Sequence, residues 1–166
     1  MPKYNHDPDL VDAVVSDFAT ERPDLDPLAI ETACRLIYVG RNMEIRAAEV
    51  LRPFGMNYTD LDVLSTLRRS GPPYELAPAD LIHAAMITSG AMTACLNRLE
   101  KEGMVVRRVS PKDRRGRIVR LTRKGRTLID KALEARFGDM KQLVSALPRK
   151  DVVELNRLLR AILGTD

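Results

Sequence analysis

Residues 88–125 read TSGAMTACLNRLEKEGMVVRRVSPKDRRGRIVRLTRKG, and this stretch decides the fold. It predicts a helix, a stop at Gly103, and a two-stranded hairpin whose tip lies at 110–116. We expect Thr88 or Ser89 to cap the helix, because a hydroxyl oxygen accepts hydrogen bonds from exposed backbone N–H groups. Gly103 stands where a left-handed residue ends a helix.

The predicted helix has one apolar face and one face of small or polar residues. The apolar side chains recur at helical spacing and are those of Met92, Cys95, Leu96 and Leu99. A helix with a short, polar leading end enters the major groove of DNA without collision. The residues that we expect to contact DNA from this helix are Ser89, Gly90, Thr93, Asn97 and Arg98.

Positive charge is concentrated in this part of the chain. Residues 98–126 hold twelve Lys or Arg and three acidic residues, a local net charge of +9, whereas the whole chain carries +4. Such a cluster neutralises phosphates and releases their counterions. Because it lies on a hairpin directly after a groove-sized helix, DNA binding explains it better than a solvated charged face does. We assign Lys112, Arg114 and Arg117 to phosphate contacts.

Two motifs follow the helix at a fixed distance, Asp113-Arg114-Arg115-Gly116 and Leu121-Thr122-Arg123-Lys124-Gly125. Together with Asn97-Arg98-Leu99-Glu100 before Gly103, they resemble the winged helix-turn-helix regulators of the MarR family. The likeness extends over about 28–163. It implies a mostly α fold with a small β-hairpin wing and with N- and C-terminal dimerisation helices.

The resemblance also implies a function and further residue roles. It implies a homodimer that binds double-stranded DNA at a pseudo-palindromic operator and acts as a ligand-responsive repressor. Arg115 matches the wing arginine that family members place in the minor groove, and Asp113 matches an acid that holds a neighbouring arginine in position. Many relatives have an arginine where this chain has Ala94, so we expect an operator without that guanine contact.

The chain divides into an acidic N-terminal extension at 1–26 and a single domain at 27–166. In the extension, the spacing of Leu10, Val14 and Phe18 predicts a short helix, with a flexible tail as the alternative. Within the domain, we expect 27–52 and 126–166 to form the dimerisation helices and 56–125 to form the DNA-binding lobe. Thr59 is expected to cap the first helix of that lobe.

The resemblance implies an effector, a small aromatic or phenolic acid bound between the dimer helices and the DNA-binding lobe. The candidate residues for this pocket are Tyr38, Arg46, Tyr58, Asp62 and His83. The sequence around residues 89–93 is similar to that of the urate- and phenolic-acid-responsive subgroup of the family. The chain has no Trp, and Cys95 stands where that subgroup has an arginine, so urate is not the expected ligand.

Cys34 carries an alternative hypothesis. Cys34, with Tyr38 one turn later and Tyr58 further on, is similar to the pattern of organic-hydroperoxide sensors, in which a cysteine oxidises beside tyrosines. This pattern predicts a redox-sensing regulator of the same fold. The competing interpretation is a small core residue, which is the usual role of a cysteine on an apolar helical face.

Composition excludes several other classes of protein. Apolar content of 45% and charged content of 30% indicate a globular chain, and no apolar run approaches the about 20 residues of a membrane span. Two cysteines and no secretory signal predict a cytoplasmic protein. His6 and His83 are the only histidines, and no metal-site spacing or phosphate loop occurs, so we expect neither an enzyme nor a cofactor. A winged-helix module that binds protein remains the second alternative.

Overall fold

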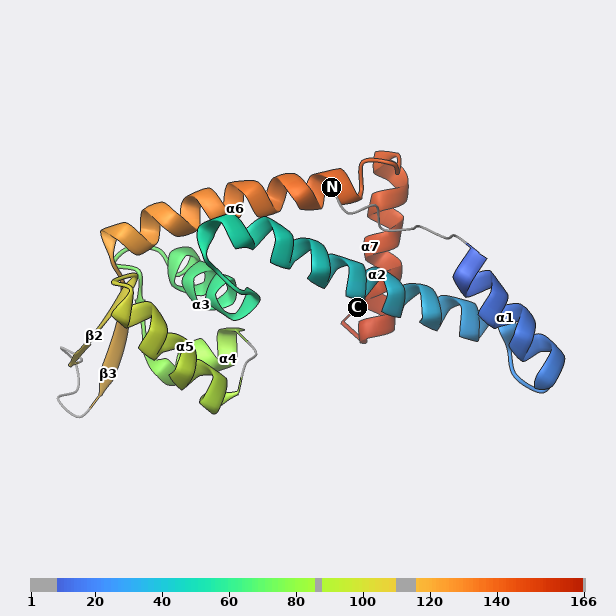
Figure 1. Ribbon diagram of the computed structural model, residues 1–166, viewed down its shortest axis with the longest axis horizontal. Coiled ribbons are helices and arrows are strands. Elements are labelled where there is room, and N and C mark those ends of the chain that lie inside the picture. The colour runs from blue at the N-terminus through green and yellow to red at the C-terminus, as the bar shows by residue number, and fades with distance from the viewer. Residues whose placement is uncertain (1–8, 86–87, 110–115, 166) are drawn as a thin grey trace. The chain divides into compact units, whose positions relative to one another are not determined.

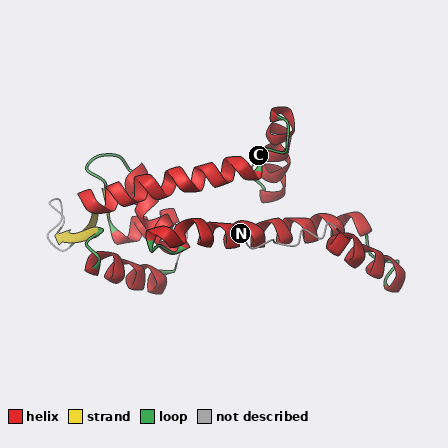
Figure 2. Ribbon diagram, turned by 45° about the horizontal axis from the view of Figure 1, so that its top comes forward, coloured by secondary structure: helices red, strands yellow, loops and turns green. Residues whose placement is uncertain are grey.

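The computed structural model describes residues 9–85, 88–109 and 116–165, and most of them are helical (Figure 1). Three short strands form one small sheet, and the yellow arrow in Figure 2 marks its position. Contacts divide the chain into two compact units, Met1–Arg46 and Ala47–Asp166.

The first unit holds helix α1 (Asp9–Glu21) and most of helix α2 (Pro27–Leu51). The side chain of Asp26 accepts a hydrogen bond from the backbone N–H of Leu28 at 3.0 Å, which caps the start of α2. Arg35 on α2 forms ion pairs with Asp12 on α1, at 2.6 Å, and with Glu31 on its own helix, at 3.0 Å. The acidic extension therefore contains the predicted helix over Asp9–Glu21.

The second unit begins with the last turn of α2 and the short 3-10 helix η1 (Arg52–Phe54), which contains Pro53. The elements that follow are α3 (Tyr58–Arg69), β1 (Glu75–Leu76), α4 (Pro78–Ala85), α5 (Ser89–Lys101), β2 (Val105–Val109), β3 (Arg117–Leu121), α6 (Arg123–Leu143) and α7 (Arg149–Leu163). Helices α4 and α5 are the predicted helix-turn-helix pair.

The start of α3 differs from the prediction. Its N-cap is Asn57, whose side chain accepts from the backbone N–H of Asp60 at 2.9 Å. The Asp60 carboxylate accepts from the backbone N–H of Asn57 at 3.0 Å, and this reciprocal pair is a capping box. The expectation that Thr59 caps the helix was wrong. The side chains of Asn57 and Asp60 each accept a hydrogen bond from the other's backbone N–H, and they cap the helix in its place.

The sheet has three antiparallel strands in the order β1-β3-β2. The hairpin pairs Val105 with Leu121 at its base and Val109 with Arg117 near its tip. The sequence predicted only this hairpin. The third strand, β1, has two residues and pairs Glu75 with Arg120.

The core of the second unit is aliphatic and is shared by α3, α4, α5, the sheet and α6. Side chains that are almost completely buried there include Leu64, Leu67, Leu81, Leu99, Val105, Val119 and Ile129. Burial of this apolar surface is the main stabilising contribution to the lobe. It fixes the positions of α5 and of the wing base relative to each other.

The junction between the wing and α6 is closely packed. Thr122 caps α6, because its Oγ1 accepts from the backbone N–H of Gly125 at 3.0 Å. The backbone of Gly125 passes so near the hairpin that an added Cβ would lie 2.1 Å from the carbonyl oxygen of Met104. Only glycine fits at this crossing.

Candidate nucleic-acid interface

Helix α5 exposes the face that the sequence predicted for DNA. Ser89, Gly90 and Thr93 are exposed at its leading end, while Met92 and Leu96 are buried on the opposite side. Thr88 is the N-cap, and its Oγ1 accepts from the backbone N–H of Ala91 at 3.3 Å. The first turn of the helix therefore presents backbone and short side chains to its surroundings.

Gly90 and Thr93 have distinct properties on this face. A Cβ added at Gly90 would meet no atom within 4 Å, so the chain's own packing does not require glycine there. The absence of a side chain instead lets another molecule approach the helix backbone. The hydroxyl of Thr93 donates to the carbonyl oxygen of Ser89 at 2.9 Å, which leaves the lone pairs of its oxygen available as acceptors.

Arg98 and Cys95 both contact one buried carboxylate, that of Asp60 on α3. The guanidinium of Arg98 is ion-paired with Asp60 Oδ1, and the thiol of Cys95 donates to the same oxygen at 3.3 Å. Burial, and then the hydrogen bond to Asp60, raises the pKa of Cys95 to about 12. The hydrogen bond to Asp60 also raises the pKa of Arg98, so the arginine remains charged. We call Asp60, Cys95 and Arg98 the Asp60 cluster.

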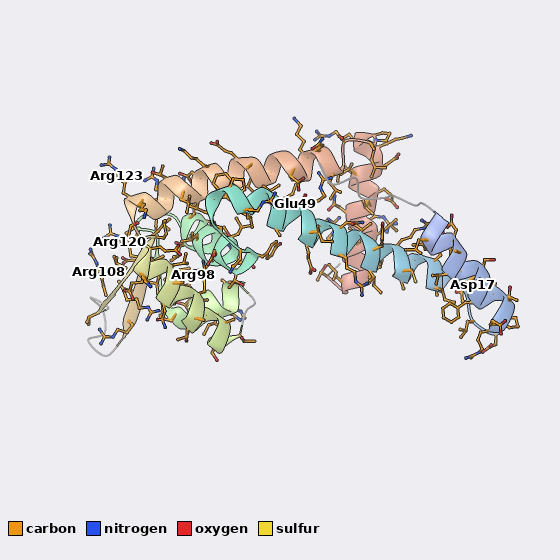
Figure 3. All side chains as sticks on the ribbon, viewed as in Figure 1. Asp17, Glu49, Arg98, Arg108, Arg120 and Arg123 are labelled. Carbon is orange, nitrogen blue, oxygen red and sulfur yellow. The ribbon has the colours of Figure 1, made fainter. Side chains whose placement is uncertain are left out.

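Asn97 is engaged by the wing. The guanidinium of Arg107 on β2 donates to Asn97 Oδ1 at 2.6 Å, and the backbone N–H of Arg107 donates to Glu100 Oε1 at 3.0 Å. We call this set the Arg107 bridge. Asn97 and Arg98, two of the predicted DNA contacts, thus make connections within the protein, while Ser89, Gly90 and Thr93 form an unobstructed face. Figure 3 shows Arg98 on the side of α5 that faces α3.

The wing contributes cations beside this face. Arg107, Arg108 and Arg117 are exposed on β2 and β3. Figure 3 shows the side chain of Arg108 extending outward from the wing. The other predicted wing contacts lie outside the described residues, and they are Lys112, Asp113, Arg114 and Arg115. Sequence reasoning assigned no role to Arg107 or Arg108, although both belong to the basic run that it identified.

The predicted effector residues lie in both units. Tyr38 and Arg46 are half-buried on α2 in the first unit. In the second unit, Tyr58 and His83 are exposed and Asp62 is half-buried, and this burial raises the pKa of the Asp62 carboxyl group. Cys34, the predicted redox residue, is a half-buried free thiol on α2.

The described part of the chain offers neither a grouped set of metal ligands nor a single membrane-spanning helix. Within 9–85, 88–109 and 116–165, no three His, Cys, Asp or Glu side chains are grouped to hold a metal ion. In the same residues, no helix by itself has the length and apolar composition needed to cross a membrane, and α4 and α5 reach that composition only when counted together across a sharp bend.

A helix-turn-helix with an open second helix and a cationic wing defines a winged helix-turn-helix DNA-binding protein. The MarR family model matches residues 54–116. The transcriptional regulator PecS of Dickeya dadantii is 31% identical over 90% of each chain. The multiple antibiotic resistance protein MarR of Salmonella typhimurium is 30% identical over 78% of this chain and 89% of that protein. The chain therefore belongs to the MarR family, and it is a DNA-binding transcriptional regulator.

A solved structure that contains operator DNA has a similar fold. The crystal structure of a mutant MarR from E. coli with operator DNA has a TM-score of 0.69 and 26% sequence identity. The match covers 88% of this chain and 97% of that one. The fold predicted from the sequence, mostly α with a winged helix-turn-helix, is confirmed.

Proposed function

We propose that the chain is a ligand-responsive repressor that binds a pseudo-palindromic operator as a homodimer. Helix α5 enters the major groove with Ser89, Gly90 and Thr93, and the wing follows the adjacent backbone. The observation that carries this proposal is the open, small-residue face of α5 beside the exposed cations Arg108 and Arg117. Arg115, outside the described residues, is assigned to the minor groove through the family resemblance.

Dimerisation is supported by apolar side chains exposed on the long helices. Regulators of this family bind operator DNA as dimers. Large apolar side chains that are at least 37% exposed include Leu28, Ile37, Val39 and Ile45 on α2, Phe137 and Leu143 on α6, and Leu155, Leu158 and Ile162 on α7. Exposed large apolar side chains on a helix face often mark a protein interface. We therefore assign 27–52 and 126–166 to dimerisation and 56–125 to DNA binding. The two-fold axis requires half-sites about one helical turn apart, ~10 bp.

Salt dependence of DNA binding tests the proposal. The operator is first isolated as genomic fragments that the protein retains, and affinity is then measured by fluorescence anisotropy. For a DNA reader, the logarithm of the binding constant falls linearly with the logarithm of salt concentration, because phosphate contacts release counterions. Salt-insensitive association with DNA, or stable capture of a protein in place of DNA, would instead support the adaptor alternative.

Two substitutions separate the roles of the wing and of α5. Arg115→Ala is expected to weaken binding to every duplex, since a minor-groove guanidinium reads shape and potential. Thr93→Ala is expected to change which operator is preferred. Arg22→Ala removes the same charge from an exposed position outside the segments assigned to DNA binding and dimerisation, and it serves as the control. If Arg115→Ala leaves the affinity for DNA unchanged at fixed salt, the proposed contact between the wing and DNA is wrong.

We propose a small aromatic acid as the effector, on the strength of the family resemblance. The test is a titration of 4-hydroxybenzoate into the protein–operator complex at constant ionic strength. Release of DNA is expected, and it is expected to need higher concentrations in single variants of the candidate residues, which are Tyr38, Arg46, Tyr58, Asp62 and His83. If all five variants release DNA at the same effector concentration as the wild type, the effector binds elsewhere.

A further inference from the structure

A groove with a volume of about 600 Å³ lies at the base of the wing, within the second unit. Its walls come from the segment after α3, from the end of β3 and from the first three turns of α6. The side chains that the argument uses are Tyr74, Arg120, Arg123, Arg126, Asp130 and Lys131. A volume of this size is within the usual range of small-molecule sites. None of the residues predicted for the effector lines this groove.

The groove carries excess positive charge. Four cationic and two acidic side chains line it. Asp130 already pairs with Arg68 at 2.6 Å and lies 3.9 Å from Arg126. In the described part of the chain, Arg120, Arg123 and Lys131 form no ion pair. A cationic concavity of this kind raises the local concentration of anions.

Tyr74 fixes one wall of the groove. Its φ is 61°, a left-handed conformation that bulky residues adopt rarely and that is common at ligand sites. Its N–H donates to the carbonyl oxygen of Gly71 at 2.6 Å, and its carbonyl oxygen accepts from Leu121 at 3.0 Å. The ring centroid lies 5.2 Å from Arg68 Cζ and 5.2 Å from Arg126 Cζ, so two guanidinium groups lie close to the ring.

We propose that this groove binds a small, doubly charged oxyanion, either a dicarboxylate or a phosphomonoester. Arg120 and Arg123 offer planar guanidinium groups that suit bidentate contacts to carboxylate or phosphate. Lys131 adds a third unpaired cation about two turns after Arg123 on α6. Figure 3 shows Arg120 and Arg123 at the same end of the lobe, where β3 leads into α6. The side chains that line the groove carry a net charge of +2, which balances the charge of a dianion.

The groove is less suited to the DNA backbone. Asp130 and Glu134 belong to its wall, and carboxylates repel a phosphodiester polyanion. They accept hydrogen bonds from a hydroxyl or amino group of a small ligand whose anionic groups contact Arg120 and Arg123. The hydroxyl groups of Thr122 and Thr127 also line the groove.

Isothermal titration calorimetry with succinate and with inorganic phosphate tests the proposal, with sodium chloride adjusted to keep ionic strength constant. The dimeric full-length protein is expected to bind one of these probes saturably, with one site per subunit. The double variant Arg123→Ala/Lys131→Ala is expected to weaken binding at least 10-fold. The matched control, Lys101→Ala/Lys141→Ala, removes the same charge from exposed positions outside the groove and is expected to leave binding unchanged.

Arg120→Ala distinguishes this groove from a neighbouring hollow lined by Met104, Lys124 and Leu128, because Arg120 lines only the former. It is expected to weaken anion binding, whereas Lys124→Ala is not. Non-saturable heat, or equal losses in the groove variant and its control, would mean charge screening only and would overturn the proposal.

Operator binding is measured in parallel on the same variants. If no anion binds and Arg123→Ala/Lys131→Ala instead weakens DNA binding, the groove contacts backbone phosphate and the proposal is overturned. Because the wild-type protein is tested for DNA binding separately, failure of the anion site leaves the regulator function intact. The two outcomes are therefore distinguishable.

Discussion

Asp60 is a completely buried carboxylate on which three contacts depend. It accepts hydrogen bonds from the backbone of Asn57 and from the thiol of Cys95, and it pairs with the guanidinium of Arg98. A buried carboxylate is costly unless it is paired and hydrogen-bonded, and here both conditions are met. The Asp60 cluster therefore attaches α5 to α3 through one side chain.

Asp60→Ala is expected to lower the free energy of unfolding by about 2–4 kcal/mol, because it removes the partner of Arg98 and half of a capping box. The loss is expected near the lower end, since Arg98 is 36% exposed and can be solvated. Urea unfolding measures the change. Asp17→Ala, at an exposed position on α1, is the control and is expected to change stability by less than about 0.5 kcal/mol. Equal losses in the two variants would contradict the role of the cluster.

The two cysteines are expected to differ in reactivity. The thiolate is the nucleophile, and the pKa of Cys95 is raised to about 12, so Cys95 is almost entirely protonated at pH 8. Cys34 is therefore expected to be alkylated first by iodoacetamide, as followed by peptide mass spectrometry. Labelling in urea, where both thiols are exposed, is the control. Equal rates in the folded protein would show that Cys95 is accessible as a thiolate.

The same raised pKa makes stability depend on pH. Between pH 9.0, the ordinary pKa of the thiol, and about pH 12, the folded chain retains the Cys95 proton that the unfolded chain releases. The contribution of Cys95 to stability is thus complete below pH 9.0 and declines as the pH rises through this window. Alkaline conditions therefore loosen the contact between α5 and α3.

At the scale of elements, local signals predicted most of the fold. Thr88 capped α5, Gly103 followed its end in a left-handed conformation with φ of 72°, and the spacing of Leu10, Val14 and Phe18 predicted α1. Each of these signals involves residues close together in the sequence. They suffice for helices and for a hairpin, whose partners are neighbours in the chain.

Features that join distant residues escaped prediction. Strand β1 has two residues and is defined by their pairing with Arg120 and Val119 of β3. The Asp60 cluster joins positions 35 and 38 residues apart. Asn97 and Arg98 had the exposed, polar character expected of DNA contacts, and only tertiary structure shows what each one contacts within the protein.

Gly125→Ala is expected to destabilise the protein by about 1–3 kcal/mol, because its Cβ would overlap the carbonyl oxygen of Met104. Gly138→Ala, on the same helix with nothing within 4 Å of the added Cβ, is expected to stabilise it by about 0.5–1 kcal/mol. Urea unfolding compares the two. A neutral Gly125→Ala would mean that the wing base can shift away from α6.

For the whole molecule, exposed apolar side chains on α7 support assembly. Leu158 and Ile162 are 45% and 61% exposed and lie one turn apart. Large apolar groups at this spacing form a stripe that packs against a partner helix. DNA recognition at two half-sites requires such a partner.

Leu158→Glu/Ile162→Glu is expected to yield monomers and to reduce operator affinity by more than 10-fold, since the second half-site is lost and charge is placed in an apolar interface. Light scattering after size-exclusion chromatography measures the mass, and anisotropy measures the affinity. Asn156→Glu, on the same helix, is the control. A stable dimer of the double variant would place the interface elsewhere.

The Arg107 bridge has a consequence for exchanging specificity between relatives. One arginine on β2 donates to Asn97 and to Glu100 of α5, so two hydrogen bonds form a joint between α5 and the wing. Grafting 89–101 from another regulator would break that joint unless the donor supplies hydrogen-bond acceptors at the same two positions. Chimeras that exchange 89–109 as one piece should therefore keep their DNA affinity better than chimeras that exchange the helix alone.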